Sequence, residues 1–222
     1  MNILIVAATE MEITPFLHHL KQQYKQLGND IFFNERHRVQ ILLTGVGMVA
    51  TTFALTRLFT EKNYDIALQA GVAGSYDKGI SLAAVCTVKT DLFGDLGAED
   101  HYRFLDVFEL GLMEENAAPY TGRLLANPHE FAFVAKLPVV SALTVNSVTG
   151  SEVTAIARWK KYGCALESME GAAFHYVCLQ KQIPFLQVRA VSNYVEARDK
   201  SLWKMNEAVT ALNEWMIHFL EG

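Results

Sequence analysis

The side chains best placed for chemistry in this sequence are two carboxylates and one amide: Glu12, Glu170 and Asn193. Each closely follows a stretch that predicts a β-strand, so each is expected at or just beyond the carboxyl end of a strand. In an open α/β sheet, ligands bind in the crevice outside those carboxyl ends. The three positions therefore predict one shared crevice, in which carboxylates accept hydrogen bonds and an amide both donates and accepts.

The elements that must position these groups alternate along the chain. Apolar runs predict strands at residues 2–8, 31–33, 38–43, 65–70, 83–89, 139–144 and 185–191, and the end of a further strand is expected from Ala165, just before Glu170. Apolar residues at helical spacing predict helices at residues 13–27, 48–61, 152–162 and 202–219, and one that starts near Met169 and is stopped by Pro184. Gly28 and Gly163 are expected to close helices, and Ser151 to begin one.

This alternation predicts an α/β fold with a central mixed, mostly parallel twisted sheet flanked by helices. Glu170 is expected in the first turn of its helix, and Asn193 just past the end of its strand. The acidic, glycine-containing stretch 90–119 predicts a long loop with short pieces of structure. A length of 222 residues suits one domain, residues 1–222.

Composition limits the possible partners and the location. The net charge is −5 and there is no basic stripe, which argues against a nucleic-acid partner. No apolar run approaches the length of a membrane span, and the N-terminus lacks the pattern of a signal peptide. The three cysteines are odd in number and lack metal-ligand spacing, which predicts buried thiols, no metal and a cytoplasmic protein.

One glycine motif suggests a different class of protein. GVGMVA at residues 45–50 matches the dinucleotide-binding pattern GxGxxA, follows a predicted strand and opens a predicted helix. However, that strand is not the first, and the next one ends at Ala70 without the expected acid. A nicotinamide or flavin oxidoreductase is therefore the weaker interpretation.

Each candidate also has a purely structural interpretation. An acid such as Glu170 is favoured near a helix N-terminus by the dipole, Glu12 suits a surface, and Asn193 suits a turn. Four further acids match no calcium loop and are expected to be solvated: Asp91, Asp95, Glu99 and Asp100. His101 and His175 have no visible partner and receive no catalytic role.

Several motifs together resemble a known family. SMEGAAFHYVC followed by PFLQVRAVSN, GVAG at residues 71–74 and the opening ILIVAATEMEI are similar to the nucleoside phosphorylase/hydrolase superfamily. Within it, the sequence most resembles the futalosine hydrolases, relatives of the methylthioadenosine/S-adenosylhomocysteine nucleosidases. The resemblance implies a three-layer nucleoside phosphorylase-like fold, a purine nucleoside as the small-molecule partner, a homo-oligomer and no cofactor.

The resemblance also implies roles for the candidates. It places Glu12 beside a nucleophilic water, and Glu170 on the ribose 2′- and 3′-hydroxyls with Met169 against the sugar. Cleavage at the anomeric carbon gives an oxocarbenium-like centre, which a carboxylate stabilises while it takes a proton from water. The same negative charge disfavours a phosphate nucleophile, and TEME carries no arginine, so hydrolysis is preferred to phosphorolysis.

Asn193 departs from the adenosine-specific relatives, which carry Asp at this position. An amide can donate to the 6-oxo oxygen of hypoxanthine and accept from a protonated N-7, whereas an ionised Asp would face the oxo oxygen with like charge. Asn193 therefore favours a 6-oxopurine nucleoside and, specifically, futalosine. The alternatives are another purine nucleosidase, a purine nucleoside phosphorylase and a non-catalytic nucleoside-binding module.

The remaining site residues come from the resemblance. Gly71 lets the backbone approach a ligand closely, and Val72 stands where the adenosine nucleosidases commonly carry Ser. Ser147 and Val148 align with apolar positions that line the pocket. Trp203 aligns with an aromatic lid residue that would cover the 5′ end of the substrate, its alternative being core packing of the last helix.

Overall fold

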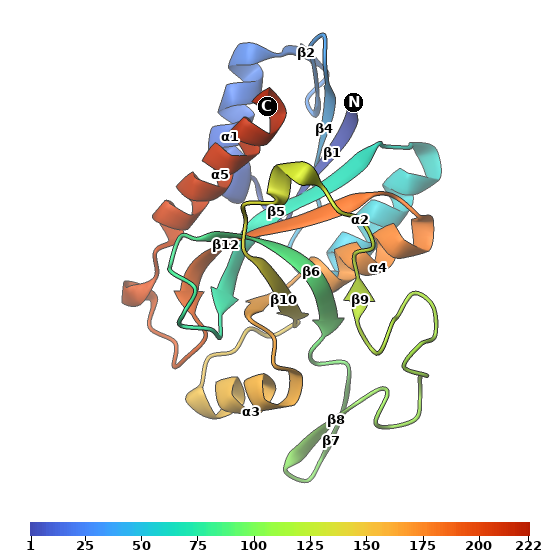
Figure 1. Cartoon of the computed structure of the whole chain (residues 1–222), viewed down its shortest axis with the longest axis vertical. Coiled ribbons are helices and arrows are strands. Elements are labelled where there is room, and N and C mark those ends of the chain that lie inside the picture. Colours follow the sequence, from blue (N-terminus) through green and yellow to red (C-terminus); the bar gives the residue numbers. More distant parts are fainter.

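One ten-stranded sheet runs through the computed structural model, which describes residues 1–222 (Figure 1). The strand order is β11-β10-β6-β12-β5-β1-β4-β3-β2, and β9 pairs with β6. The strands are β1 (Asn2–Ala7), β2 (Lys25–Leu27), β3 (Ile31–Phe33), β4 (Arg38–Leu43), β5 (Ile66–Ser75), β6 (Val85–Phe93), β9 (Leu125–Ala126), β10 (Val139–Thr144), β11 (Leu166–Ser168) and β12 (Phe185–Tyr194).

The sheet is mixed, and its longest pairings are parallel, between β12 and β5, β1 and β4, and β10 and β6. Strand β11 pairs with β10 and also, antiparallel, with β5. Strands β11, β10, β6, β12 and β5 therefore close into a ring, while β1, β4, β3 and β2 extend from β5 as an open sheet. This closure places the carboxyl-terminal end of β5 between β12 and β11.

Helices cover both faces of the open part of the sheet, which confirms the layered α/β fold (Figure 1). Helices α1 (Glu10–Gln23) and α5 (Met205–Glu221) pack on one face, and α2 (Met48–Glu61) and α4 (Gly171–Lys181) on the other. Smaller elements are α3 (Glu152–Tyr162), the hairpin β7 (Gly97–Asp100) with β8 (Arg103–Asp106), and the short 3₁₀ turns η1 (Ala132–Val134) and η2 (Lys200–Leu202). No helix combines the length and the apolar character that crossing a membrane requires.

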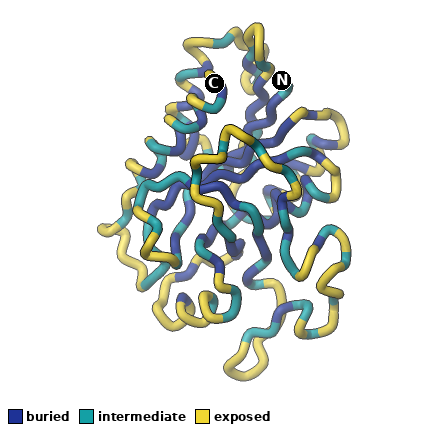
Figure 2. Tube along the Cα trace, viewed as in Figure 1, coloured by how far each residue is buried: buried dark blue, intermediate teal, exposed yellow.

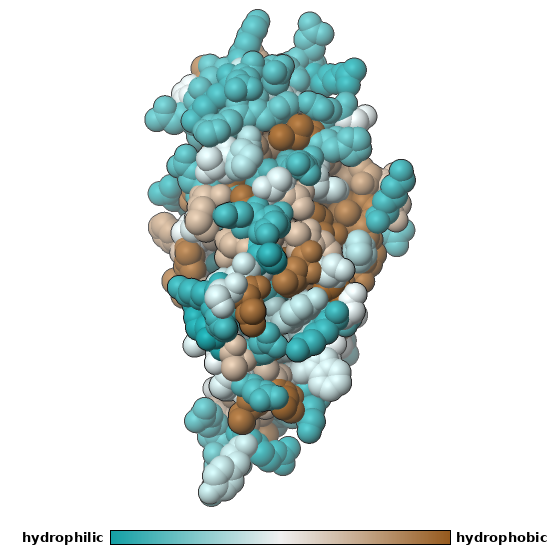
Figure 3. Space-filling view, turned by 90° about the vertical axis from the view of Figure 1, so that its left-hand side faces the viewer, coloured by the Kyte–Doolittle hydropathy of each residue, from teal (hydrophilic) through white to brown (hydrophobic).

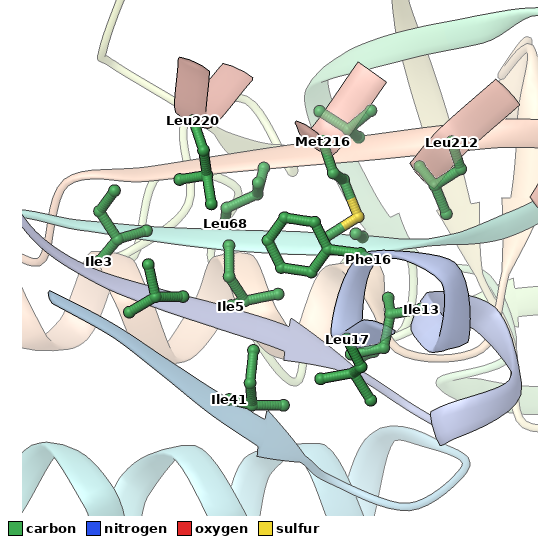
Figure 4. Close-up of a cluster of buried hydrophobic side chains, with 14 of the residues drawn as sticks. Ile3, Ile5, Ile13, Phe16, Leu17, Ile41, Leu68, Leu212, Met216 and Leu220 are labelled. Carbon is green, nitrogen blue, oxygen red and sulfur yellow. The ribbon is translucent and has the colours of Figure 1, made fainter. Parts of the chain in front are cut away.

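Strand β1 shows why its sequence is a continuous apolar run. Ile3 and Ile5 point into the cluster under α1 and α5, whereas Leu4 and Val6 point into the cluster under α2 and α4. Because successive side chains of a strand face opposite sides, a strand covered on both faces must be apolar at every position. Figure 4 shows Phe16 of α1 among the strand and α5 side chains, and Figure 2 shows the sheet as the buried centre of the chain.

Several predicted bounds are confirmed without change. The structure has a strand at Val139–Thr144 and a helix at Met48–Glu61. Ser151 is the N-cap of α3, since its hydroxyl accepts from the Thr154 N–H at 3.2 Å. Gly163 closes that helix in a left-handed conformation, with φ of 63°.

The first helix is shorter than predicted. It ends at Gln23, and residues 25–27 form β2, an edge strand that pairs antiparallel with β3. Leu27 is exposed and so continues no buried stripe, and the positive φ of Gly28 serves the turn between β2 and β3. Sequence periodicity missed this strand because the pairing with β3, and not burial, defines it.

The strands at the site are longer than predicted. Strand β5 continues through GVAG to Ser75, β6 continues to Phe93, and β12 continues to Tyr194. Asn193 therefore lies within β12, opposite Gly74 and just after a break in register at Val191. Backbone pairing between β5 and β12 extends beyond the apolar run, so the run underestimates the strands.

Two helix ends also differ from the prediction. Helix α4 begins at Gly171, so Glu170 is its N-cap and does not lie in its first turn. It ends at Lys181 because Gln182 adopts a left-handed conformation, before Pro184 is reached. Leu202 lies in η2 and is exposed, so it is not part of the buried stripe of α5.

Candidate active site

Glu12 is buried at the start of α1, and both of its carboxylate oxygens are held. Oε1 accepts from the Val72 N–H at 3.1 Å, and Oε2 accepts from the N–H and the hydroxyl of Thr9 at 3.1 and 3.2 Å. The bonds to Thr9 close a capping box at the N-terminus of α1. A carboxylate has about four acceptor positions, so Glu12 keeps one for a ligand or a water molecule.

Glu170 is the second buried carboxylate, although it is the N-cap residue of α4. Its Oε1 accepts from the Gly47 N–H at 3.0 Å, and Oε2 lies 3.8 Å from Nη1 of Arg189. Burial raises the pKa of Glu170, Arg189 and the Gly47 N–H oppose that rise, and the charge of Glu12 adds to it. The two predicted acids therefore lie close enough to influence each other.

Gly47 belongs to the GVGMVA motif, and its contact gives that motif a use other than dinucleotide binding. Gly47 is the N-cap of α2, where free backbone N–H groups and the helix dipole attract an anion. In this structure the anion is the carboxylate of Glu170 from the same chain. The motif thus helps to build the site and gives no support for a nicotinamide or flavin enzyme.

Arg189 is a buried charged residue of the candidate site that sequence reasoning missed. It is only 1% exposed, it donates from Nη2 to Gln69 Oε1 at 2.9 Å, and it lies beside Glu170. A Cβ at Gly71 would lie 2.4 Å from Arg189 Nη1 and 2.9 Å from Glu12 Oε1. Gly71 therefore lacks a side chain because these two charged groups occupy the space that its Cβ would need. The available signal was an arginine inside an otherwise apolar strand.

Asn193 lies next to Gly74 on β5 and is half-buried. Its Oδ1 accepts from the Ser192 hydroxyl at 2.8 Å, and one N–H donates to the Tyr194 carbonyl at 2.9 Å. The amide has two N–H groups, so one can still donate to a ligand. A Cβ at Gly74 would lie 2.8 Å from Val195 Cγ2 and 3.3 Å from Asn193 Nδ2, so this glycine makes room for both side chains.

Strand β5 therefore separates two kinds of groups. The carboxylate of Glu12 lies beside Gly71 and Val72, Glu170 is joined to this end through Arg189, and the amide of Asn193 lies beside Gly74. Three residues of strand span about 10 Å. Acidic groups at one end and an amide at the other suit a ligand with hydroxyls at one end and a polar ring at the other.

The structure places the other predicted residues around this strand. Met169 is half-buried directly before Glu170, and Val72 packs its side chain on the core below α1 and α5 while its N–H faces Glu12. Ser147 and Val148 are exposed on the loop after β10. Trp203 lies with Asn193 on a small cavity of about 30 Å³. Trp203 comes just before α5 in the chain. Its place on this cavity puts it at the Asn193 end of the site.

A partly buried ion pair holds the loop that carries Ser147 and Val148. Glu167 of β11 accepts from the N–H and the hydroxyl of Thr149 at 2.7 and 2.6 Å. Arg158 of α3 donates to the Ser147 carbonyl at 3.0 Å and forms an ion pair with Glu167 at 3.2 Å. Sequence reasoning missed Glu167 and Arg158, since neither has a motif that distinguishes it from a surface charge.

A large cavity of about 920 Å³ does not border Glu12, Glu170 or Asn193. It lies between α3 and residues 195–202, where Ile156, Trp159 and Leu202 are partly exposed. Figure 3 faces this side of the molecule and shows apolar surface gathered between polar ends. Size alone therefore does not identify the candidate site, which rests on the convergence of polar groups around β5.

Asp91 corrects the expectation that the acids near residue 90 are solvated. It is fully buried in β6, where its carboxylate accepts from Thr144, Gln187 and the N–H of Leu92. Burial raises its pKa to about 6, although those hydrogen bonds and the charge of Arg189 oppose the rise. His175 is also fully buried, with Nδ1 on the Leu125 carbonyl, and burial lowers its pKa to about 4.

Known structures share this fold. The structure of futalosine hydrolase from Helicobacter pylori superposes with a TM-score of 0.79 at 16% identity, covering 99% of this chain and 97% of that one. Together with the site at the strand ends, this defines an α/β protein of the nucleoside phosphorylase type. The chain belongs to the phosphorylase superfamily, whose family model matches residues 2–221.

Curated relatives fall into two groups of that superfamily. Futalosine hydrolase from Thermus thermophilus is 34% identical over 174 residues, which cover 77% of this chain and 76% of that protein. A 5′-methylthioadenosine/S-adenosylhomocysteine nucleosidase from Psychromonas ingrahamii is 24% identical over 234 residues, which cover 96% of this chain and 94% of that protein. The resemblance inferred from the sequence motifs is confirmed.

The buried groups of Asp91 and His175 predict opposite dependences of stability on pH. Folding raises the pKa of Asp91 above its unfolded value of 3.8, so its contribution to stability grows as pH falls from 6 to 4. Folding lowers the pKa of His175 below 6.5, so its contribution is lost as pH falls from 6.5 to 4. The two slopes, each at most about 1.4 kcal/mol per pH unit, nearly cancel in the wild type.

Urea unfolding between pH 4 and 7 tests this cancellation. Asp91→Asn should make stability fall more steeply on acidification than in the wild type. His175→Asn keeps a donor for the Leu125 carbonyl and should make stability fall less steeply or rise. Parallel curves for the wild type and both variants would contradict the assignment of these two groups.

Proposed function

We propose that this chain hydrolyses the N-glycosidic bond of futalosine and releases hypoxanthine and dehypoxanthine futalosine. The observation that carries the proposal is the arrangement along β5, with an anchored carboxylate, Glu12, at Val72 and an amide, Asn193, at Gly74. The 34% identity to a curated futalosine hydrolase supports the same substrate. The chain is thus an N-glycosyl hydrolase for a purine nucleoside.

Glu12 takes the role of general base. Its three hydrogen bonds fix both oxygens and leave one acceptor position that can hold the attacking water. As the bond to the purine breaks, positive charge develops on the sugar, and the carboxylate stabilises that charge while it takes a proton from the water. A positioned base of this kind contributes roughly 10²–10⁴-fold to the rate.

Glu170 binds the ribose. Two vicinal hydroxyls offer two donors, and the Glu170 carboxylate has acceptor positions besides the one that the Gly47 N–H uses. Arg189 supplies the positive charge that allows two acids to be buried together. Met169, the residue directly before Glu170, covers the face of the sugar.

Asn193 recognises the base. Its remaining N–H donates to the 6-oxo oxygen of hypoxanthine, on which negative charge develops as the base leaves. Ser147 and Val148 line the pocket around the purine. Trp203 shares a small cavity with Asn193, so it covers this end of the substrate and not the 5′ end that the resemblance implies. The loop of Ser147 and Val148 is held by Arg158 and Glu167, which limits the loss of entropy on binding.

Hydrolysis fits the site better than phosphorolysis. The cation nearest to Glu12 is Arg189, whose Nη atoms face Gln69 and Glu170 inside the protein. A phosphate would also have to approach two carboxylates, which like charge disfavours. The methylthioadenosine type of activity stays the alternative because a relative with that name aligns over most of the chain.

We further propose that residues 1–222 act as one domain in a cytoplasmic homo-oligomer whose product serves menaquinone biosynthesis. Val49 and Phe53 lie one turn apart on α2 and are 81% and 66% exposed, which suits contact with a second copy. The three cysteines are buried free thiols, as a reducing compartment allows. Light scattering would measure the oligomeric state.

The purified protein should release hypoxanthine from futalosine in phosphate-free buffer, with methylthioadenosine a poor substrate. The physical reasons are the carboxylate of Glu12, which repels phosphate, and the amide of Asn193, which matches an oxo group. Chromatography of the products measures the release with and without phosphate. Equal turnover of both nucleosides, or an absolute need for phosphate, would overturn the assignment.

Glu12→Gln should fold normally, still bind hypoxanthine and lose about 10²–10⁴-fold in kcat, because an amide cannot take the proton from water. Glu170→Gln should instead raise KM and lower kcat, since contacts to the ribose tighten in the transition state. Steady-state kinetics and product titration separate the two effects. Nearly full activity of Glu12→Gln would show that another group activates the water.

Asn193→Asp should lower kcat/KM for futalosine at least tenfold. An ionised Asp loses the donor to the oxo oxygen and brings like charge to the leaving base, and about 1.4 kcal/mol is enough for a factor of ten. The 6-amino analogue of futalosine should lose less or gain, because its amino group donates to a carboxylate oxygen. If the ratio of kcat/KM for futalosine to that for its 6-amino analogue is the same in variant and wild type, Asn193 does not determine which base the enzyme prefers.

A further inference from the structure

The N-terminus of α4 is not capped by its own N-cap residue. A side chain at this position normally accepts from the free N–H groups of the first turn. Glu170 occupies the position but makes no such bond, because its carboxylate turns away to the Gly47 N–H and toward Arg189. The buried N–H groups at the start of α4 therefore need other acceptors.

Hydroxyls of the sheet supply those acceptors. The Ala172 N–H donates to Thr144 Oγ1 at 2.7 Å, and the Gly171 N–H donates to Ser168 Oγ at 3.3 Å. Thr144 Oγ1 in turn donates to Asp91 Oδ1 at 2.8 Å. Thr144 and Asp91 are both completely buried, so this chain from helix to carboxylate is shielded from water.

Asp91 is fixed directly beneath the first residue of the helix. Its Oδ1 also accepts from the Leu92 N–H, and its Oδ2 accepts from Gln187 Nε2 at 3.1 Å. A Cβ at Gly171 would lie 2.2 Å from Asp91 Oδ2 and 2.3 Å from Gln187 Nε2. The helix thus starts in contact with a carboxylate, where the dipole favours negative charge.

We propose that Thr144 and Asp91 are positioning residues for Glu170: Thr144 accepts from the N–H of α4 in place of the Glu170 side chain, Asp91 holds the Thr144 hydroxyl in place, and the Glu170 carboxylate is left for the ligand. If no other acceptor were available, the side chain of an acidic N-cap residue would turn back and accept from the N–H groups of the first helical turn. Thr144 and Asp91 remove that competing use, and Thr144 ties the helix start to β10. The inference rests on the proposed function only in that the ligand of Glu170 is a ribose.

Thr144→Val tests the inference, with Thr144→Ser as the matched control that keeps the hydroxyl. The readout is the ratio of kcat/KM for futalosine to that for its 2′-deoxy analogue, which reports contact between Glu170 and the sugar hydroxyls. Thr144→Val should lower this ratio at least tenfold, toward the value of Glu170→Gln, while Thr144→Ser stays within threefold of wild type. General loosening of the protein would lower both kcat/KM values and leave their ratio unchanged.

A second readout needs no catalysis. Amide hydrogen exchange followed by NMR reports on the Gly47 N–H, which donates to Glu170, and on the Val72 N–H, which donates to Glu12. Thr144→Val should speed exchange at Gly47 at least tenfold and leave Val72 unchanged. Thr144→Ser should change neither amide.

The outcomes separate the two proposals. Wild-type values in both readouts for Thr144→Val would overturn the positioning role while the proposed function stands. Failure of the wild type to cleave futalosine would overturn the proposed function, and exchange at Gly47 would still decide the positioning role. If Thr144→Val does not fold, Asp91→Asn decides: it should move both readouts in the same direction by at least threefold, and wild-type values would overturn the inference.

Discussion

Two carboxylates and one guanidinium, those of Glu12, Glu170 and Arg189, are buried together around Gly71. Removing a charge from water is costly unless partners replace the lost solvation. Here Arg189 faces Glu170 and donates to Gln69, Glu12 is held by three donors, and Glu170 receives the N–H at the start of α2. The site exists only because several separate elements supply these partners at once.

This requirement explains features that look unrelated in the sequence. Gly71 carries no side chain because Arg189 and Glu12 fill that space, and Gly171 carries none because Asp91 and Gln187 lie against it. The glycine motif at residues 45–50 ends in a helix N-terminus that holds a carboxylate of the same chain. Glycines thus mark places where polar side chains pack against backbone as much as places where a ligand approaches.

The two ends of the site are built from different elements. The carboxylate end lies among the longest strands and the start of α4, whereas the Asn193 end borders a loop and the segment that precedes α5. The loop is held by the ion pair of Arg158 and Glu167, and Arg198 lies over the ring of Trp203. Loops tolerate substitution better than paired strands, so residues at this end can vary without disturbing the charged centre.

The sequence by itself determined the alternation of strands and helices, the apolar character of β1, the caps of α3 and the chemical types at positions 12, 170 and 193. These follow from local periodicity and from residue chemistry, which one stretch of chain contains in full. Only the tertiary structure decided that Asn193 lies inside a strand, that Glu170 is an N-cap with its side chain turned away, and that Asp91 is buried. The roles of Arg189, Glu167 and Thr144 also depend on the tertiary structure. Arg189 and Glu167 form ion pairs, and Thr144 accepts from the N–H of Ala172, with partners that are distant in sequence. Strand pairing and the burial of charge depend on such distant partners, so a local stretch of sequence does not predict them.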